Sequence, residues 1–94
     1  MHVLAMELDV RIEHAHSLKD KRQVVKSLLE TARRRFAVSA AEVGSQDSWQ
    51  RAQLGFAVVS STVRQAEDVM ESVDRFVWSR PEIEVLSAEH RWLE

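Results

Sequence analysis

The sequence predicts an α/β fold of two layers, with two helices packed on one face of a four-stranded, mainly antiparallel sheet. Apolar residues recur at every second position in several stretches, which indicates strands, and at every third or fourth position in two others, which indicates helices. The chain has 94 residues, of which 45% are hydrophobic and 30% charged, with only 2 glycines and 1 proline. A chain of this size and composition folds as one unit, so we expect a single domain over residues 1–94.

The first half of the chain predicts a strand, a helix and a second strand. Within residues 2–12 the even positions are apolar from the fourth residue onward, which is typical of a strand with one buried face. Ser17 stands three residues before an acidic residue, as in a capping box, and apolar residues at helical spacing continue from there to Phe36. A short extended stretch over residues 37–43 follows, and a polar loop at 44–48 ends it.

The second half repeats this order. Residues 50–60 alternate as a strand does, although both of its faces become partly apolar. Thr62 precedes a glutamine by three residues and predicts the start of a second helix, which Pro81 ends. Residues 83–93 predict a last strand, and because the alternation breaks after Val85 we expect a bulge or an early end there.

The resulting order is strand, helix, strand, strand, helix, strand, which is the ferredoxin-like βαββαβ arrangement. Both helices are long enough to cross over the sheet and are expected on the same face. The other face of the sheet must then be solvated, covered by a partner or used for binding.

The composition excludes several kinds of chemistry. The chain has no cysteine, which rules out disulfides, thiol catalysis and cysteine-based metal sites and favours a reducing compartment, so we expect a cytoplasmic protein. No apolar run approaches the roughly 20 residues of a membrane-spanning helix, and the acidic start does not fit a secretory signal. His14 and His16 lack a third ligand at a suitable spacing, and no catalytic or nucleotide-binding motif is present. We therefore expect no enzyme activity, no cofactor, no metal and no membrane partner.

Positive charge is concentrated in the first predicted helix. Residues 17–36 hold seven lysines and arginines against two acidic residues, in a chain whose net charge is −2. Four of these cations fall on one side of a helical wheel and form a ridge roughly 20 Å long, which can follow phosphates without reading bases. The alternative is that long basic side chains border the core and keep the helix hydrated, and that Arg33–Arg35 interact with the helix dipole.

Two groups of candidate contact residues follow. Those expected to contact RNA are Lys19, Lys21, Arg22, Lys26, Arg33, Trp49 and Arg51. Small apolar residues on the open face of the sheet predict self-association, and those expected at this interface are Val3, Ala5, Ala57 and Val59. The alternative for the second group is that these residues only make one end of the sheet face partly apolar, without self-association.

The tryptophans and the sheet face bear on the mode of binding. Trp49, Trp78 and Trp92 fit either packing at the margin of the core or contact with a partner, because tryptophan is enriched in both settings. The open face of the predicted sheet carries no aromatic residue. Stacking of bases on that face, as in RNA-recognition motifs, is therefore not expected.

Two motifs resemble those of a known family. The run SLKDKR at residues 17–22 and the segment DSWQRA at 47–52, together with EV at 42–43 and LGFAVVS at 54–60, are similar to the YlxP-like family of small bacterial proteins. The resemblance spans nearly the whole chain. It implies a ferredoxin-like fold, a bacterial origin and a gene often found among those for translation initiation and ribosome maturation. It implies no known active site, because the function of that family is not established.

The sequence thus favours a non-enzymatic, ferredoxin-like protein that binds structured RNA, with ribosomal RNA as the expected target, through its basic first helix. A homodimer or larger homo-oligomer built through the sheet face, with no nucleic-acid partner, remains open as the alternative. A small-ligand sensor is a third hypothesis and rests on analogy of fold alone.

Overall fold

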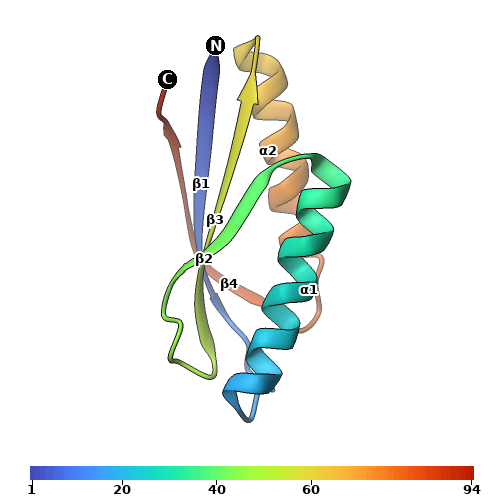
Figure 1. The fold of residues 1–94 in the computed structure, drawn as a ribbon, viewed down its shortest axis with the longest axis vertical. Helices are drawn as coiled ribbons and strands as arrows, with labels where there is room; N and C mark the ends of the chain where they lie inside the picture. The colour runs from blue at the N-terminus through green and yellow to red at the C-terminus, as the bar shows by residue number, and fades with distance from the viewer.

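The chain alternates strands and helices in the order that the sequence predicts (Figure 1). A computed structural model describes all residues from Met1 to Glu94. Its elements are β1 (His2–Arg11), α1 (Leu18–Phe36), β2 (Ser39–Gly44), β3 (Arg51–Ser60), α2 (Val63–Trp78) and β4 (Glu84–Trp92).

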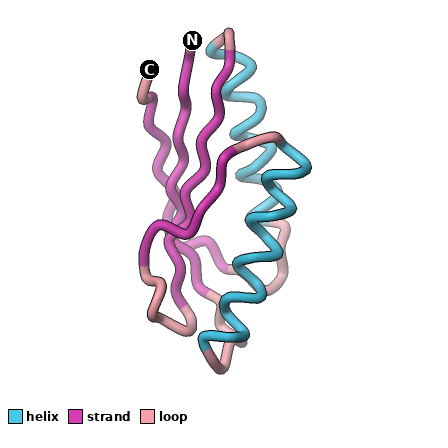
Figure 2. The backbone as a smooth tube through the Cα atoms, viewed as in Figure 1, coloured by secondary structure: helices cyan, strands magenta, loops and turns pink.

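The four strands form one sheet in the order β2-β3-β1-β4, and every neighbouring pair is antiparallel. Figure 2 shows the sheet as one layer and the two helices as the other. This arrangement confirms the ferredoxin-like βαββαβ fold. In the two central strands Ala5 lies opposite Ala57, and on the other side Ala5 lies opposite Arg91.

Both helices begin where the capping residues predict. The Ser17 side chain accepts a hydrogen bond from the Asp20 N–H at 3.1 Å, and the Thr62 side chain accepts one from the Gln65 N–H at 3.1 Å. These bonds satisfy backbone donors that have no partner inside the first turn of a helix. The Asp20 carboxylate accepts a hydrogen bond from the His16 N–H. In a capping box it would instead accept from the N–H of Ser17, one residue later. Neither helix combines the length and the apolarity needed to cross a membrane.

Strand β2 begins later than the predicted 37–43. Ala37 has φ of 54° and ψ of 44°, in the left-handed region, and its N–H donates to the Arg33 carbonyl at 3.1 Å. Ala37 therefore ends α1 as a left-handed cap, a position where glycine is more usual. Because the chain reverses direction there, pairing with β3 starts only at Ser39.

The predicted irregularity of the last strand is a bulge. Ser87 pairs with Asp9 and Val85 pairs with Val10, which leaves Leu86 as the extra residue on β4. The strand continues beyond the bulge to Trp92, so it does not end early. A second register shift, around Val43 in β2, was not indicated by the sequence.

The core lies between the sheet and the helices. It contains 21 buried apolar residues, among them the even-numbered Leu4, Met6, Leu8 and Val10 of β1. Helix α1 packs over β2, whereas α2 packs over β3 and β1 and touches β4 only weakly. The helices therefore leave much of β4 uncovered on the face of the sheet that packs against the core.

Candidate nucleic-acid interface

The start of α1, which carries the SLKDKR motif, contacts β2 and the β2–β3 loop at one end of the molecule. The Lys21 Nζ, in the first turns of α1, lies 2.6 Å from the Glu42 Oε2. The same ammonium group donates hydrogen bonds to the carbonyls of Ser45, at 2.8 Å, and Gln46, at 3.3 Å. Lys21 thus fastens the β2–β3 loop to the start of α1.

Gln50 joins the same loop to the segment between β1 and α1. Its side-chain Nε2 donates to the carbonyls of Glu13, at 3.0 Å, and Ala15, at 3.4 Å. Its own carbonyl accepts from the Ile12 N–H at 2.8 Å. Both loops at this end, which is the lower end in Figure 1, are therefore held against each other and against the helix.

Lys21 is not a surface residue, and its predicted contact with phosphates is wrong. The residue is 0% exposed. At 100° per residue it lies on the side of α1 that also carries Val25 and Leu28, four and seven positions later, and both of these are buried in the core. An ion pair with Glu42 and two carbonyl acceptors compensate the burial of its charge. The helical spacing was a signal that could have identified this role.

The other predicted cations of α1 do reach the surface. Lys19, Arg22 and Lys26 are exposed, as is Arg34, which the prediction did not include. The six ion pairs of the protein involve Arg11, Lys21, Arg51, Arg75, Arg80 and Arg91. Of the cations on α1 only the buried Lys21 is therefore neutralised by a carboxylate. We call the set Lys19, Arg22, Lys26 and Arg34 the α1 basic face. Glu30 lies between Lys26 and Arg34 on the same side of the helix and forms an ion pair with neither.

Arg33 and Arg35 stand at the end of the same helix and contact uncharged groups. Arg33 donates from Nε to the Ala40 carbonyl at 3.1 Å, with a second bond from Nη2, and so ties α1 to β2. The Arg35 guanidinium lies 5.1 Å from the ring centre of Phe36 and 5.8 Å from that of Phe76. Because these partners carry no net charge, both arginines keep their positive charge at the surface.

Trp49 and Arg51 have different surroundings. Trp49 is 54% exposed in the loop that Lys21 fastens to α1, so its ring is free at the same end as Lys19. Arg51 pairs with Asp9 at 2.5 Å across the two central strands. Both residues of this pair belong to the set of odd-numbered strand residues on the open face of the sheet. The structure therefore does not bring Arg51 together with the basic face of α1.

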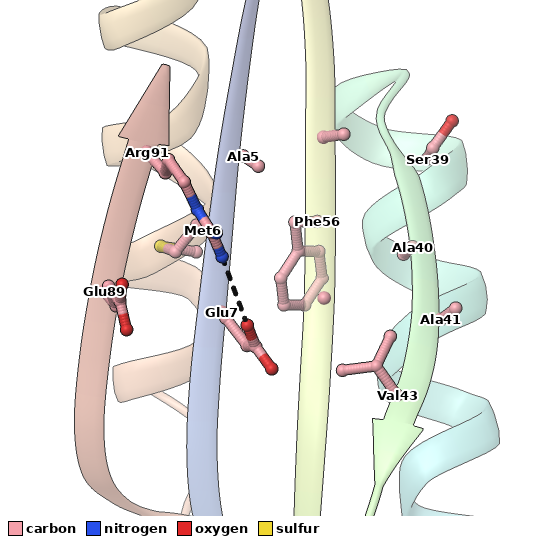
Figure 3. Close-up of a pocket in the computed structure, with 12 residues that line it drawn as sticks. Ala5, Met6, Glu7, Ser39, Ala40, Ala41, Val43, Phe56, Glu89 and Arg91 are labelled. Carbon is pink, nitrogen blue, oxygen red and sulfur yellow. Dashed lines mark ion pairs between the residues drawn. The ribbon is translucent and has the colours of Figure 1, made fainter. Parts of the chain in front are cut away.

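The open face of the sheet holds the predicted interface residues. Val3, Ala5 and Ala57 are partly buried, whereas Val59 is 66% exposed. A shallow trough of about 340 Å³ crosses the same face (Figure 3). Glu7, Glu89 and Arg91 line one side of it, and the residues that form its apolar part are Ala5, Ala40, Ala41, Val43, Gly55, Phe56 and Ala57.

Comparison with known proteins supports the resemblance that the motifs carry. The family described as "Protein of unknown function (DUF503)" matches residues 3–90. The "Uncharacterized protein YlxP" of Bacillus subtilis (strain 168) is 42% identical over 86 residues, which cover 92% of this chain and 94% of that protein.

A solved structure supports the fold alone. It is the solution NMR structure of a de novo designed protein, LFR1 1, with a ferredoxin fold. Its TM-score is 0.56 at 13% identity, and the match covers 98% of this chain and 83% of the designed one. The match over residues 3–90 establishes that the chain belongs to the DUF503 family, whose function is unknown, and the 42% identity makes it a relative of YlxP.

Proposed function

We propose that this protein binds structured RNA through the α1 basic face and the loop end beside it, without catalysing a reaction. The observation that carries the proposal is that Lys19, Arg22, Lys26 and Arg34 are exposed on one helix and that none of them pairs with a carboxylate. In a chain of net charge −2, such a face is a local attraction for an anion rather than a consequence of overall charge.

The dimensions of the α1 basic face suit a nucleic-acid backbone. From Lys19 to Arg34 the helix rises by roughly 22 Å, at about 1.5 Å per residue. Phosphates bound along it would position the RNA without reading its sequence, and the affinity would fall steeply with salt. Trp49 lies in the loop that Lys21 joins to this helix and offers an exposed ring on which an unpaired base can stack.

The setting of this proposal is the bacterial cytoplasm. The family resemblance implies a gene often found among those for translation initiation and ribosome maturation, which favours ribosomal RNA as the target.

Charge reversal tests the proposal. Replacing Lys19, Arg22 and Lys26 by Glu should abolish retention of ribosomal RNA fragments at low salt, while circular dichroism shows an intact fold. The control reverses Arg11, Arg64 and Arg91, which are exposed and lie outside α1, so that the net charge changes equally. The proposal is wrong if the first variant retains RNA as the parent does, or if both variants lose it to the same extent.

A second candidate function, a homo-oligomeric interaction module with no nucleic-acid partner, is favoured by the open sheet face. Val59 is exposed on this face, and so is Val43, which lines the shallow trough. Most charges near this patch are paired, because Arg51 pairs with Asp9 and Arg91 lies 3.9 Å from Glu7, which leaves Glu89 as an unpaired carboxylate at the trough. Two copies related by a two-fold axis would bury the patch on both subunits without strong repulsion.

The oligomeric state separates the two candidates. A dimer that persists on dilution, that Ala57→Arg splits into monomers and that retains no RNA at low salt would favour the second. Val63→Arg serves as the control, because Val63 is apolar and 44% exposed but begins α2, away from the open face of the sheet. A monomer whose RNA retention depends on salt would favour the first candidate and reject the second.

A further inference from the structure

The side of β4 that faces the helix layer is open. His90 and Trp92 pair with Met6 and Leu4, whose side chains lie in the core, so all four belong to the same face of the sheet. Met6 and Leu4 are buried, whereas His90 and Trp92 are exposed. This outer strand has only a weak contact with α2, which lies mainly over β3 and β1.

A groove of about 310 Å³ runs between α2 and β4 as a result. The residues that line it are Leu4, Glu67, Met70, Glu71, Asp74, His90 and Trp92. Leu4 and Met70 are buried members of the core and give the groove an apolar floor. One wall consists of Glu67, Glu71 and Asp74 on α2, which we call the carboxylate flank. The other consists of the rings of His90 and Trp92 on β4.

The carboxylate flank is largely unneutralised. Glu67, Glu71 and Asp74 are spaced four and three residues apart, which places them on one side of α2. Arg75 pairs with Glu71 at 3.2 Å, but Glu67 and Asp74 have no ion-pair partner. The Asp74 Oδ1 is also buried, and no group of the chain donates a hydrogen bond to it. Buried polar atoms without a partner are rare in folded proteins, so this oxygen is free to accept a hydrogen bond from water or from a bound partner.

Two exposed tryptophans lie on the two elements that form the groove, one on α2 and one on β4. Trp78 follows Asp74 by four residues on the same flank of α2 and is 59% exposed, and Trp92 on β4 is 42% exposed. Tryptophan is the residue type most enriched among the energetic centres of protein interfaces. The RNA-binding proposal makes no use of either residue, and the acidic flank between them would repel phosphates.

We infer that the groove between α2 and β4 binds a basic amphipathic segment of a partner protein. Apolar side chains of that segment would pack over Leu4 and Met70 and against Trp92. An arginine or lysine of the segment would donate to the Asp74 carboxylate and pair with Glu67. Charge complementarity therefore selects the partner: a segment with its own carboxylates would face three acidic side chains.

Peptide display gives a direct test. Random peptides of about 12 residues match the rise of α2 from Glu67 to Trp78, roughly 16 Å. We expect selection on the parent protein to enrich peptides with arginine or lysine beside apolar residues. A synthetic copy of an enriched peptide should bind Asp74→Asn and Trp92→Ala at least about tenfold more weakly than the parent.

Controls distinguish binding from folding. Asp68→Asn removes an exposed carboxylate of α2 outside the groove and should leave peptide affinity unchanged. The thermal midpoint of Asp74→Asn should equal or exceed that of the parent, because the unpartnered charge is removed. Failure to enrich any peptide, enrichment of acidic peptides, or equal affinity for all variants would contradict the inference. Self-association that Asp74→Asn abolishes would identify a second copy as the occupant and would also reject it.

Discussion

The ammonium group of Lys21 lies 2.6 Å from the Glu42 carboxylate and is fully enclosed by the protein. The pair joins the second turn of α1 to β2, and the carbonyls of Ser45 and Gln46 complete the shell around the ammonium. A lysine in the middle of a basic motif thus organises the loop that presents Trp49, while the neighbouring Lys19 and Arg22 remain exposed.

Truncation of Lys21 should strongly destabilise the fold. Lys21→Ala leaves the Glu42 carboxylate and two carbonyls without their partner, and loss of one member of a buried pair costs about 3 kcal/mol or more. Urea unfolding measures this loss. Lys26→Ala, an exposed change in the same helix, should stay within about 0.5 kcal/mol of the parent. A small effect at Lys21 would show that the enclosed pair contributes little.

The double variant Lys21→Met with Glu42→Leu should regain most of the stability that Lys21→Ala loses. The reason is that apolar residues of similar volume remove both charges at once and avoid their desolvation cost. If the double variant is less stable than Lys21→Ala, the attraction between Lys21 and Glu42 exceeds the cost of removing their charges from water. The ion pair then stabilises this end of the protein.

Trp49 should contribute to RNA affinity through stacking. Trp49→Ala should weaken binding by about 1–3 kcal/mol, the usual contribution of one stacked base, and Trp49→Phe should restore most of it. Fluorescence titration with an RNA that contains an unpaired loop measures both effects. Trp78→Ala removes an equally exposed tryptophan from α2 and should not change RNA affinity, so an equal loss there would argue against stacking at Trp49.

The cap of α2 should contribute measurably to stability. Thr62→Ala removes the oxygen that accepts the Gln65 N–H and should lower the free energy of unfolding by about 1 kcal/mol. Thr62→Asp should preserve it. Ser61→Ala, one residue earlier and exposed, is the matched control and should have no effect in thermal or urea unfolding. An unchanged midpoint for Thr62→Ala would mean that solvent replaces the cap.

The turn between α2 and β4 should show acid-dependent stability. Burial alone would raise the pKa of Glu82, but Arg80, which donates a hydrogen bond to its carboxylate and pairs with it at 2.7 Å, holds that pKa below its ordinary value. A carboxyl group with a lowered pKa in the folded state stabilises the protein above its unfolded pKa, and this stabilisation is lost as the pH falls through the folded pKa.

Glu82→Gln should therefore be less stable than the parent at neutral pH, and the difference should shrink as the pH falls below the ordinary range of a glutamate. Unfolding curves across acidic pH measure the difference. Glu13→Gln, at an exposed carboxylate without an ion pair, is the control and should be as stable as the parent. A difference for Glu82→Gln that is independent of pH would exclude Arg80 as its cause.

Local patterns were sufficient for the fold. The alternation in residues 2–12 and 50–60 and the helical spacing after Ser17 and Thr62 correctly predicted the elements, because strand faces, helix faces and caps depend on neighbours close in sequence. The bulge near Val85 was visible for the same reason. The left-handed cap at Ala37 was not, since alanine gives no local sign of that conformation.

Contacts between residues far apart in sequence could not be predicted from such local patterns. The chain itself determined that α1 carries a surplus of positive charge and that β1 has one apolar face. Only the folded chain decided which of those charges remain free, because Glu42 and the β2–β3 loop close over Lys21 while Asp9 of β1 takes up Arg51. It also decided that β4 extends beyond the helices and leaves a groove, since the reach of a helix layer over a sheet depends on packing among elements far apart in sequence.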